Sequence, residues 1–347
     1  MPDNLRILLI RTDRLGDLVL STPAITSFRR SYPRARIEAL VGEYNEPILR
    51  FNPCLDTVHV LRQHTGPVQT RAIARRLGEG LDLAVSLAPR TPDYQLAWMT
   101  GARKRIGYVY RRRYLSRLAA HIMLSDYCIS DADPDLADRY PDQPVAHEVE
   151  QVLTLVTLAG GGVISSELVF NVGDDAADFA REHVPSGATG LNLAPRWFAE
   201  DFGFDAVRAL IERLAEEQKD VAVTYGRDVR EAALRLRSAV RAPNVAWVGE
   251  QPTLYWAAAI GRCSVLISVD CGAVHVAAAQ GVPVVAVYER RYFRLSSQEW
   301  SPWRVPSVIL CKPPLRASSA PLIDDIAGGV RGLAAHVAAP QPQPLES

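Results

Sequence analysis

Short apolar runs alternate with longer amphipathic segments along most of the chain. This alternation predicts parallel strands joined by helical crossovers. In the first half of the chain, the runs rich in β-branched residues are expected to be strands at 6–11, 37–41, 57–61 and 83–87. The segments between them are expected to be helices near 17–31, 45–51, 68–79 and 93–100.

The alternation pauses and then begins again. Residues 125–146 carry many Asp and Pro residues and are expected to form a loop, whereas 147–158 has one apolar face at helical spacing. Three glycines end that helix, and 163–175 is expected to be a connector. The strands expected in the second series are 190–193, 221–225, 245–248, 265–269 and 282–288. Its helices are expected near 203–217, 228–240, 252–261 and 273–280.

Two such series in 347 residues match the length of two domains. We therefore expect an α/β protein with two Rossmann-like parallel-sheet domains facing each other across a cleft, and ligands at the carboxyl ends of the strands. The domain boundaries that the pattern predicts are 1–165 for the first domain, 166–186 for a linker and 187–337 for the second domain. Residues 338–347 hold three prolines and are expected to be a disordered tail.

The composition excludes several other classes of protein. With 48% hydrophobic and 22% charged residues, the chain can bury substantial cores and is not disordered throughout. Its longest apolar stretch, 273–288, is interrupted by His275 and Pro283 and does not predict a membrane-spanning helix. The apolar run 7–10 is too short for a secretory signal, so a cytoplasmic location is expected. Five widely spaced cysteines fit reduced thiols.

The turn after the first predicted strand carries the first candidate chemistry. Residues 11–17 contain one glycine, Gly16, whereas a dinucleotide-binding turn needs Gly-x-Gly-x-x-Gly. This argues against an NAD or FAD dehydrogenase. The turn instead offers Asp17, which either caps the following helix or, kept ionised by the helix N-terminus, serves as a base or fixes a substrate hydroxyl. Gly16 would allow a ligand to approach, and Asp13 competes for the role of Asp17 from nearer the strand.

A second informative turn follows the predicted strand 265–269. It runs Asp270-Cys271-Gly272-Ala273-Val274-His275 directly before a helix of small residues. A strand, Asp-x-Gly and a helix start direct free amides and a positive dipole end at one point, which suits a phosphate or diphosphate. The alternatives are that Asp270 caps the helix and that His275 is a buried structural histidine. At another strand end, Glu231 could accept hydrogen bonds from ribose hydroxyls or lie on a solvated helix.

These two turns, in this order, resemble those of the family-nine glycosyltransferases, which include the ADP-heptose:lipopolysaccharide heptosyltransferases. The matching segments are 7–11 with 15–24, 147–149 (His-Glu-Val, opening a helix), 268–279 and 281–288. The resemblance spans residues 5–312. It implies a GT-B architecture, with the acceptor on the first domain and the nucleotide sugar on the second. It also implies inverting transfer with no metal ion.

The resemblance also implies roles for individual residues. Asp17 matches the aspartate assigned as the catalytic base. Independently of the resemblance, Gly16 and Arg14 in the same turn are expected to bind the acceptor. The segment 270–275 matches the donor-binding turn, in which amides of Gly272 and Ala273 would hold the diphosphate leaving group. The donor that the family implies is ADP-heptose, and no cofactor is expected. No Asp-x-Asp pair lies where it could hold Mg²⁺.

The chain departs from the family pattern on the donor side. Cys271 stands where the family has Ser or Thr, and Arg196, next to Trp197, is our candidate for the family lysine, able to bind phosphate in two-pronged fashion. Residues 289–293 lack the usual glycine. These departures leave open another nucleotide sugar, a small-molecule or protein acceptor, or a non-catalytic module that binds ADP-sugars. The retained Asp17 speaks against the last of these.

Positive charge is concentrated in the first part of the chain. Residues 1–120 hold 20 Lys plus Arg against 10 Asp plus Glu, although the whole chain carries 39 of each. Seven of these basic residues lie in 103–117, including Arg111, Arg112 and Arg113. The stretch is either a solvated surface or a site for an anionic glycan or glycolipid acceptor, with peripheral contact to the anionic inner membrane. No nucleic-acid-binding motif accompanies it, so no nucleic-acid partner is expected.

Overall fold

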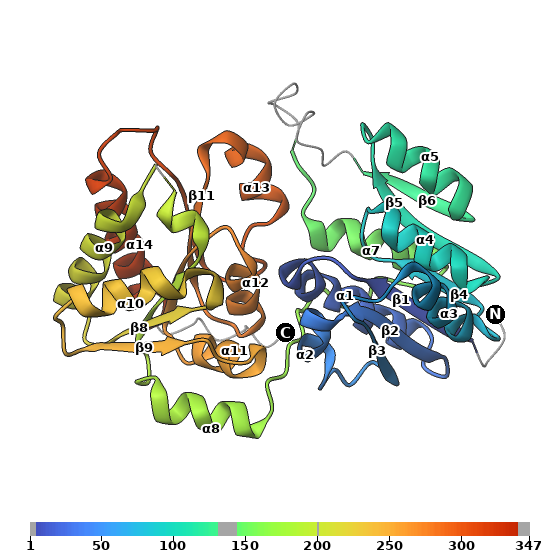
Figure 1. Cartoon of the computed structure of the whole chain (residues 1–347), viewed down its shortest axis with the longest axis horizontal. Coiled ribbons are helices and arrows are strands. Elements are labelled where there is room, and N and C mark those ends of the chain that lie inside the picture. The colour runs from blue at the N-terminus through green and yellow to red at the C-terminus, as the bar shows by residue number, and fades with distance from the viewer. Residues whose placement is uncertain (1–4, 131–143, 200, 339–347) are drawn as a thin grey trace, which may run out of the picture. The chain divides into compact units, whose positions relative to one another are not determined.

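The computed structural model describes residues 5–130, 144–199 and 201–338. The chain forms two compact units, and each is an α/β domain (Figure 1). The first unit comprises Met1–Asn171 together with Arg294–Trp300. The second unit comprises Val172–Phe293 and Ser301–Ser347.

The first unit is built on a six-stranded parallel sheet with the strand order β3-β2-β1-β4-β5-β6. Its strands are β1 (Arg6–Arg11), β2 (Arg36–Gly42), β3 (Thr57–Leu61), β4 (Leu83–Ser86), β5 (Lys104–Tyr110) and β6 (Asp126–Ser130). Its helices are α1 (Leu15–Ser31), α2 (Glu46–Leu49), α3 (Pro67–Gly78), α4 (Thr91–Thr100), α5 (Tyr114–Met123) and α7 (Glu148–Leu158). Helix α13 (Phe293–Glu299) adds its residues from 294 onward to this unit.

The second unit repeats the same topology with the strand order β12-β11-β10-β7-β8-β9. Its strands are β7 (Thr189–Leu193), β8 (Val221–Tyr225), β9 (Val245–Gly249), β10 (Val265–Val269), β11 (Val284–Tyr288) and β12 (Ser307–Cys311). Its helices are α8 (Asp174–His183), α9 (Gly203–Glu217), α10 (Arg230–Ala239), α11 (Thr253–Gly261), α12 (Gly272–Ala279) and α14 (Ala320–Ala338). None of the helices in the described ranges is long and apolar enough to cross a membrane.

The central strands form the cores because they are apolar on both faces. β1 contains the buried apolar run Ile7–Ile10, and β10 is buried throughout with Ser268 as its one polar residue, as expected for parallel strands covered by helices on both sides. In the first unit, the core gathers Leu8, Ile10 and Tyr94. In the second unit, the indole of Trp197 is completely buried and donates to the main-chain carbonyl of Asn192.

Both sheets change direction at one place. In the first unit this point lies between β1 and β4, and in the second it lies between β7 and β10. Ligands of open α/β sheets bind beyond the carboxyl ends of the strands at such a switch point. The topology therefore places the turns after β1 and after β10, the two turns that the sequence singles out, where each sheet is expected to bind its ligand.

The sequence pattern missed three strands, β5, β6 and β12. β5 lies inside the basic stretch, where its charged start concealed a buried run from Ile106 to Tyr110. The predicted loop 125–146 is wrong at its start, because Asp126–Ser130 forms β6, and residues 131–143 lie outside the described part of the chain. β6 is a half-buried edge strand that begins and ends with a polar residue, whereas β12, also a half-buried edge strand, was missed although it contains the apolar run Val308-Ile309-Leu310.

The predicted linker also differs from the structure. The segment 166–186 contains α8, which packs against α11 of the second unit, with the rings of Phe179 and Tyr255 5.2 Å apart. Its buried side is made by Ala176 and Ala180 among charged residues, a pattern too weak to predict a helix. The return of 294–300 to the first unit was not predicted either. Of the predicted tail, Ala338 closes α14 and the remainder is outside the described residues.

Candidate active site

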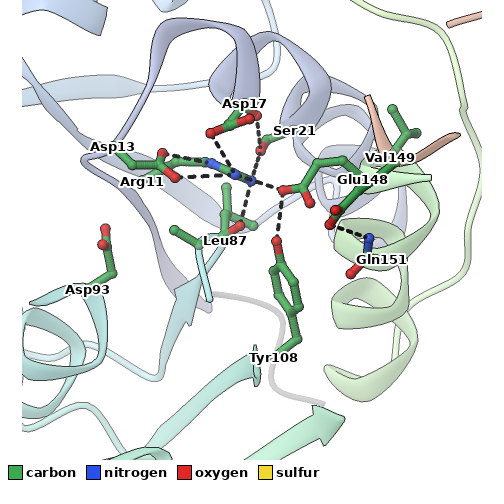
Figure 2. A network of polar contacts seen from close by, with 12 residues as sticks. Arg11, Asp13, Asp17, Ser21, Leu87, Asp93, Tyr108, Glu148, Val149 and Gln151 are labelled. Carbon is green, nitrogen blue, oxygen red and sulfur yellow. Dashed lines mark hydrogen bonds and ion pairs between the residues drawn. The ribbon is translucent and has the colours of Figure 1, made fainter. Parts of the chain in front are cut away.

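The candidate site of the first unit is built around a buried arginine. The apolar strand β1 ends at Arg11, whose guanidinium is almost completely buried. It donates to Asp13 Oδ1 over 3.0 Å, to Glu148 Oε1 over 2.7 Å and to the carbonyl oxygen of Leu87 over 2.6 Å (Figure 2). Leu87 follows β4, so the guanidinium spans the switch point between β1 and β4.

The carboxylates around Arg11 stabilise the positive charge of its guanidinium. Burial alone would lower the pKa of the guanidinium, but the charges of Asp13, Glu148 and Asp17 outweigh burial and raise it. One cation therefore faces three carboxylates. Such a cluster is stable only when its polar atoms are hydrogen-bonded, as those of the guanidinium are here.

Glu148 reaches Arg11 from the start of α7. His147 is the N-cap of this helix, and its Nδ1 accepts from the amide of Val149 over 3.1 Å, which confirms that His-Glu-Val opens a helix. Glu148 Oε1 also accepts from the hydroxyl of Tyr108 over 2.7 Å. Burial raises the pKa of Tyr108, so this hydroxyl keeps its proton and donates it. Sequence reasoning treated Glu148 only as part of a motif and missed Arg11 and Tyr108.

Asp17 is the third residue of α1 and does not cap the helix. The N-cap is Arg14, which makes no side-chain capping bond. Asp17 Oδ2 is 3.8 Å from Nη2 of Arg11. The side chain of Asp17 is 18% exposed, against 8% for Asp13 and 1% for Glu148. Of the three carboxylates around Arg11, Asp17 is therefore the one that solvent and a substrate can best reach, which favours it over Asp13.

The ionisation of Asp17 differs from the expectation. Although Asp17 lies in the first turn of a helix, burial, with smaller contributions from the charges of Asp13 and Glu148, raises its pKa from 3.8 to about 8 against the opposing effect of Arg11. The helix dipole does not keep this carboxyl ionised at neutral pH, because burial and two like charges outweigh it. A raised pKa makes the carboxylate a stronger proton acceptor once it is ionised.

A second buried carboxyl lies behind this cluster. Glu299 of α13 accepts from the hydroxyl of Tyr110 over 2.8 Å and from Gln151 Nε2 over 3.2 Å. Burial and the charge of Glu148 raise the pKa of Glu299 well above its usual range. These contacts fasten residues 294–300 to the first unit. No sequence motif marks Glu299, so its place could not be predicted.

The other residues expected near the acceptor lie on the same edge of the sheet. Gly16 is buried within the first turn of α1, and Arg14 is exposed beside it. Arg111, Arg112 and Arg113 form the turn between β5 and α5. The guanidinium of Arg113 lies over the ring of Tyr110, 4.6 Å from its centroid. The basic stretch thus lies partly in β5 and α5, and its three consecutive arginines follow the carboxyl end of a strand.

The second unit brings two of the predicted donor residues together. Arg196, in the turn after β7, donates from Nη1 to Asp270 Oδ2 over 2.5 Å, and also to the main-chain carbonyl of Asp270. The N-cap of α12 is Cys271, so Asp270 lies outside the helix. This ion pair joins the ends of the adjacent strands β7 and β10, at the switch point of the second sheet.

The thiol of Cys271, which the resemblance sets in place of a Ser or Thr hydroxyl, lies at the N-cap of α12. It is 3.3 Å from Ser268 Oγ and accepts from Asn192 Nδ2 over 3.6 Å. Burial raises the pKa of Cys271, so this side chain is a neutral thiol. The hydroxyl of Ser268, within β10, also donates to the main-chain carbonyl of Val269 over 3.0 Å.

The remaining donor-side predictions are placed as follows. Gly272 and Ala273 are the first two residues of α12. His275 is buried within the same helix, as in the structural alternative given for it. Glu231 is exposed in the first turn of α10. It follows β8, which is next to β7 on the side away from β10.

A buried lysine near Arg196 was missed. Lys312, which follows β12, has no exposed surface and donates from Nζ to Asp201 Oδ1 over 2.8 Å. It also donates to the main-chain carbonyl of Arg196 and so holds the turn that carries the guanidinium. The chain has only three lysines, and this rarity was the one signal that could have drawn attention to it.

Comparison with known proteins places the chain in a family. The family described as glycosyltransferase family 9 (heptosyltransferase) matches residues 136–319, more than half of the chain. Lipopolysaccharide heptosyltransferase 3 of Escherichia coli is 22% identical over 310 residues, with 83% of each chain covered. The match to the family does not include Asp17.

Two solved structures share the fold. A family 9 glycosyltransferase from Veillonella parvula aligns with a TM-score of 0.78 and 18% identity, covering 96% of this chain and 98% of that one. The ADP-heptose lipopolysaccharide heptosyltransferase II of E. coli aligns with a TM-score of 0.72 and 17% identity, covering 96% and 100%. The expected GT-B architecture with two Rossmann-like domains is confirmed. The chain belongs to glycosyltransferase family 9, the heptosyltransferases, and is a glycosyltransferase.

Proposed function

We propose that the protein transfers heptose from ADP-heptose to a sugar hydroxyl of the lipopolysaccharide core or a related anionic acceptor, with inversion at the anomeric carbon. The proposal rests on Asp17, the most exposed of three carboxylates around a buried arginine. The names of the E. coli relatives, which include ADP-heptose and lipopolysaccharide, support the donor and the acceptor. We further propose that the protein works in the cytoplasm, at the inner face of the inner membrane.

The proposed chemistry needs one base and one site for the leaving group. Ionised Asp17 accepts the proton of the acceptor hydroxyl while its oxygen bonds to the anomeric carbon. The bond from that carbon to the diphosphate oxygen breaks, and ADP leaves with the bonding electrons. Attack from the side opposite the leaving group inverts the anomeric configuration. Arg11 stays fixed and charged throughout, because its other partners are buried.

On the donor side, we propose that Arg196 and the amides of Gly272 and Ala273 bind the diphosphate. Arg196 is part-exposed, so its guanidinium can turn from Asp270 towards an incoming phosphate. The amides at the start of α12 supply a positive dipole end. We propose that these groups do the work of a divalent cation and that His275 and Glu231 contribute less, the first buried and the second exposed on a neighbouring helix.

The choice of nucleotide tests this proposal against its main alternative. Because Cys271 and Arg196 replace family residues, another nucleotide sugar or another acceptor on the same scaffold is the second candidate function. Calorimetric titration of the protein with ADP, UDP, GDP and CMP, each with and without EDTA, is expected to show binding of ADP alone and no effect of EDTA. Preference for another nucleotide would support the alternative. A protein that binds ADP-heptose but never turns it over with any acceptor would be a binding module.

The raised pKa of Asp17 predicts an unusual pH profile. Only the ionised carboxylate accepts a proton, so kcat/KM is expected to rise about tenfold per pH unit up to the neighbourhood of pH 8. A base with the usual pKa of Asp would give a flat profile above pH 5. The measurement is the initial rate at low acceptor concentration between pH 5.5 and 9. A rate that does not change between pH 5.5 and 8 would contradict the assignment.

The arginine turn between β5 and α5 is proposed to hold the anionic acceptor. Replacing Arg111, Arg112 and Arg113 by Ala is expected to raise the KM for the acceptor about tenfold at low salt and less at high salt, because exposed charges are screened. The affinity for ADP should not change. A matched control removes three exposed arginines from α3 of the same unit: Arg71, Arg75 and Arg76. Equal effects of the two triple variants would show that only the overall charge matters.

A further inference from the structure

The outer face of α5 is apolar where a solvent-facing helix is normally polar. Tyr114, Leu115, Leu118 and Ile122 are all exposed, and Leu115 is 84% exposed. At 3.6 residues per turn these positions fall within about 100° of arc, so they form one continuous stripe. The opposite side of the helix, around Ala120, packs on β5, β6 and α4 (Figure 1). This stripe is called the α5 face below.

The segment of the chain that contains the α5 face is rich in positive charge. Residues 103–125 contain seven Lys or Arg and no Asp or Glu. Arg111, Arg112 and Arg113 lie at the N-terminal end of the stripe, and Arg117 lies within the helix. An exposed apolar stripe with a cluster of arginines at one end complements an anionic, partly apolar surface. A bilayer that contains anionic phospholipid is such a surface.

We infer that α5 docks in the interface of an anionic phospholipid bilayer, with its apolar face among the acyl chains and its arginines at the headgroups. A second copy of this chain is a poorer occupant, because a symmetric contact would bring arginine against arginine across the interface. An apolar protein surface would not account for the charge. A helix of 10 residues gives weak, reversible binding, as suits an enzyme that must move between acceptors.

The position of α5 in the first unit suggests what membrane docking would do for the enzyme. Its N-terminal turn follows the carboxyl end of β5, on the sheet edge that carries Asp17. Tyr110, the last residue of β5 before that turn, donates from its hydroxyl to the buried carboxyl of Glu299. Docking through α5 would thus hold the acceptor edge of the first unit near the membrane surface. This use of docking rests on the proposed function, in which the acceptor is attached to a lipid in the membrane.

The test measures flotation of the whole protein with vesicles that contain no glycolipid. Vesicles of phosphatidylcholine with phosphatidylglycerol are expected to bind the protein, and vesicles of phosphatidylcholine alone are not. The double variant Leu115→Gln/Leu118→Gln should bind about tenfold less well. The control is Val68→Gln on α3, which changes an apolar residue that is 83% exposed in the same unit and should bind as the unsubstituted protein does.

Three results would overturn the docking inference. The first is that the protein does not bind anionic vesicles, and the second is that the double variant binds them as well as the unsubstituted protein does. The third is that sedimentation shows the unsubstituted protein to be a salt-insensitive dimer and the double variant to be a monomer. Both substitutions are on the surface, so unchanged thermal unfolding confirms that the variant is folded. Titration with ADP is done in parallel. A protein that binds ADP but no vesicle overturns docking alone, whereas one that binds vesicles but neither ADP nor any nucleotide sugar overturns the proposed function alone.

Discussion

Replacement of Asp17 by Asn is expected to abolish most sugar transfer while leaving the protein folded and able to bind ADP. The amide is nearly the same size as the carboxyl but cannot accept the hydroxyl proton. Removal of a general base lowers rates by about 10²- to 10⁴-fold. The loss should appear in kcat, because the hydroxyl is still bound but not activated. Steady-state kinetics with ADP-heptose and calorimetry with ADP measure the two quantities separately.

The stability of the Asp17→Asn variant gives an independent check. In the folded protein the pKa of Asp17 is raised to about 8, whereas the ordinary value is 3.8. The neutral form is therefore favoured by folding, so this carboxyl does not oppose folding below about pH 4 and opposes it increasingly as pH rises towards 8. Asn cannot ionise. The variant should thus be more stable than the unsubstituted protein at pH 8, and the gain should shrink as pH falls towards 4.

Asp205 provides a matched control for Asp17. It is also the third residue of its helix, α9, but it is exposed. Asp205→Asn should change neither the rate nor the pH dependence of thermal unfolding. A gain in stability together with a loss of turnover in Asp17→Asn alone would assign the base. If Asp17→Asn transferred sugar at the unsubstituted rate, another group would have to take the proton.

The sequence predicts the position of Asp17 but not its environment. A buried strand followed by Gly-Asp and a helix indicates a site at the switch point, because parallel topology fixes where the ends of such strands lie. Two partners of Arg11 are distant in the chain: Leu87, which follows β4, and Glu148 of α7, which is 137 residues away. No local pattern predicts that contact. The pKa of Asp17 depends on these distant charges, which is why the expectation of an ionised carboxylate was wrong.

Three of the strands that are buried on both faces were predicted with the correct limits. β1, β8 and β10 are buried on both faces and stand out as apolar runs, so their limits in the structure equal the predicted ones. β6 and β12 are half-buried edge strands, but so are β3 and β9, which the pattern did predict, so edge position alone does not explain why β6 and β12 were missed. Helix α13 is short, and its residues reach the first unit from far along the chain. Its position depends on tertiary contacts of Glu299 with Tyr110 and Gln151, which a local pattern does not contain.

Replacement of Arg11 by Met is expected to destabilise the protein by about 3–5 kcal/mol, because it leaves buried carboxylates without their cation. For a domain of this size the apparent unfolding midpoint should fall by roughly 10 °C. The loss should grow with pH, since carboxyls can remain protonated at low pH. Arg11→Lys keeps the charge but cannot span Asp13, Leu87 and Glu148 together. Its unfolding midpoint should therefore lie between those of the unsubstituted protein and of Arg11→Met.

A positioning role for Arg11 in the reaction has its own signature. Arg11 lowers the pKa of Asp17, so Arg11→Met should move the rising limb of the pH–rate profile to higher pH. The control is Arg6→Met, at the other end of β1, where Arg6 pairs with the buried Glu38 over 2.6 Å. Loss of that pair should also lower the unfolding midpoint. It should leave the pH profile in place, because Glu38 is not part of the Asp17 cluster.

The double variant Arg11→Met/Glu148→Gln separates the ion pair from general loss of packing. If the Arg11→Met penalty comes from the stranded charge of Glu148, neutralising Glu148 should recover part of it. The double-mutant cycle should then give a coupling of about 1–3 kcal/mol between the two residues in thermal unfolding. Strictly additive effects would mean that the 2.7 Å contact contributes little and that Asp13 and Asp17 carry the charge balance. In that case the shift of the pH profile would still be expected, because Arg11 acts on Asp17 directly through space.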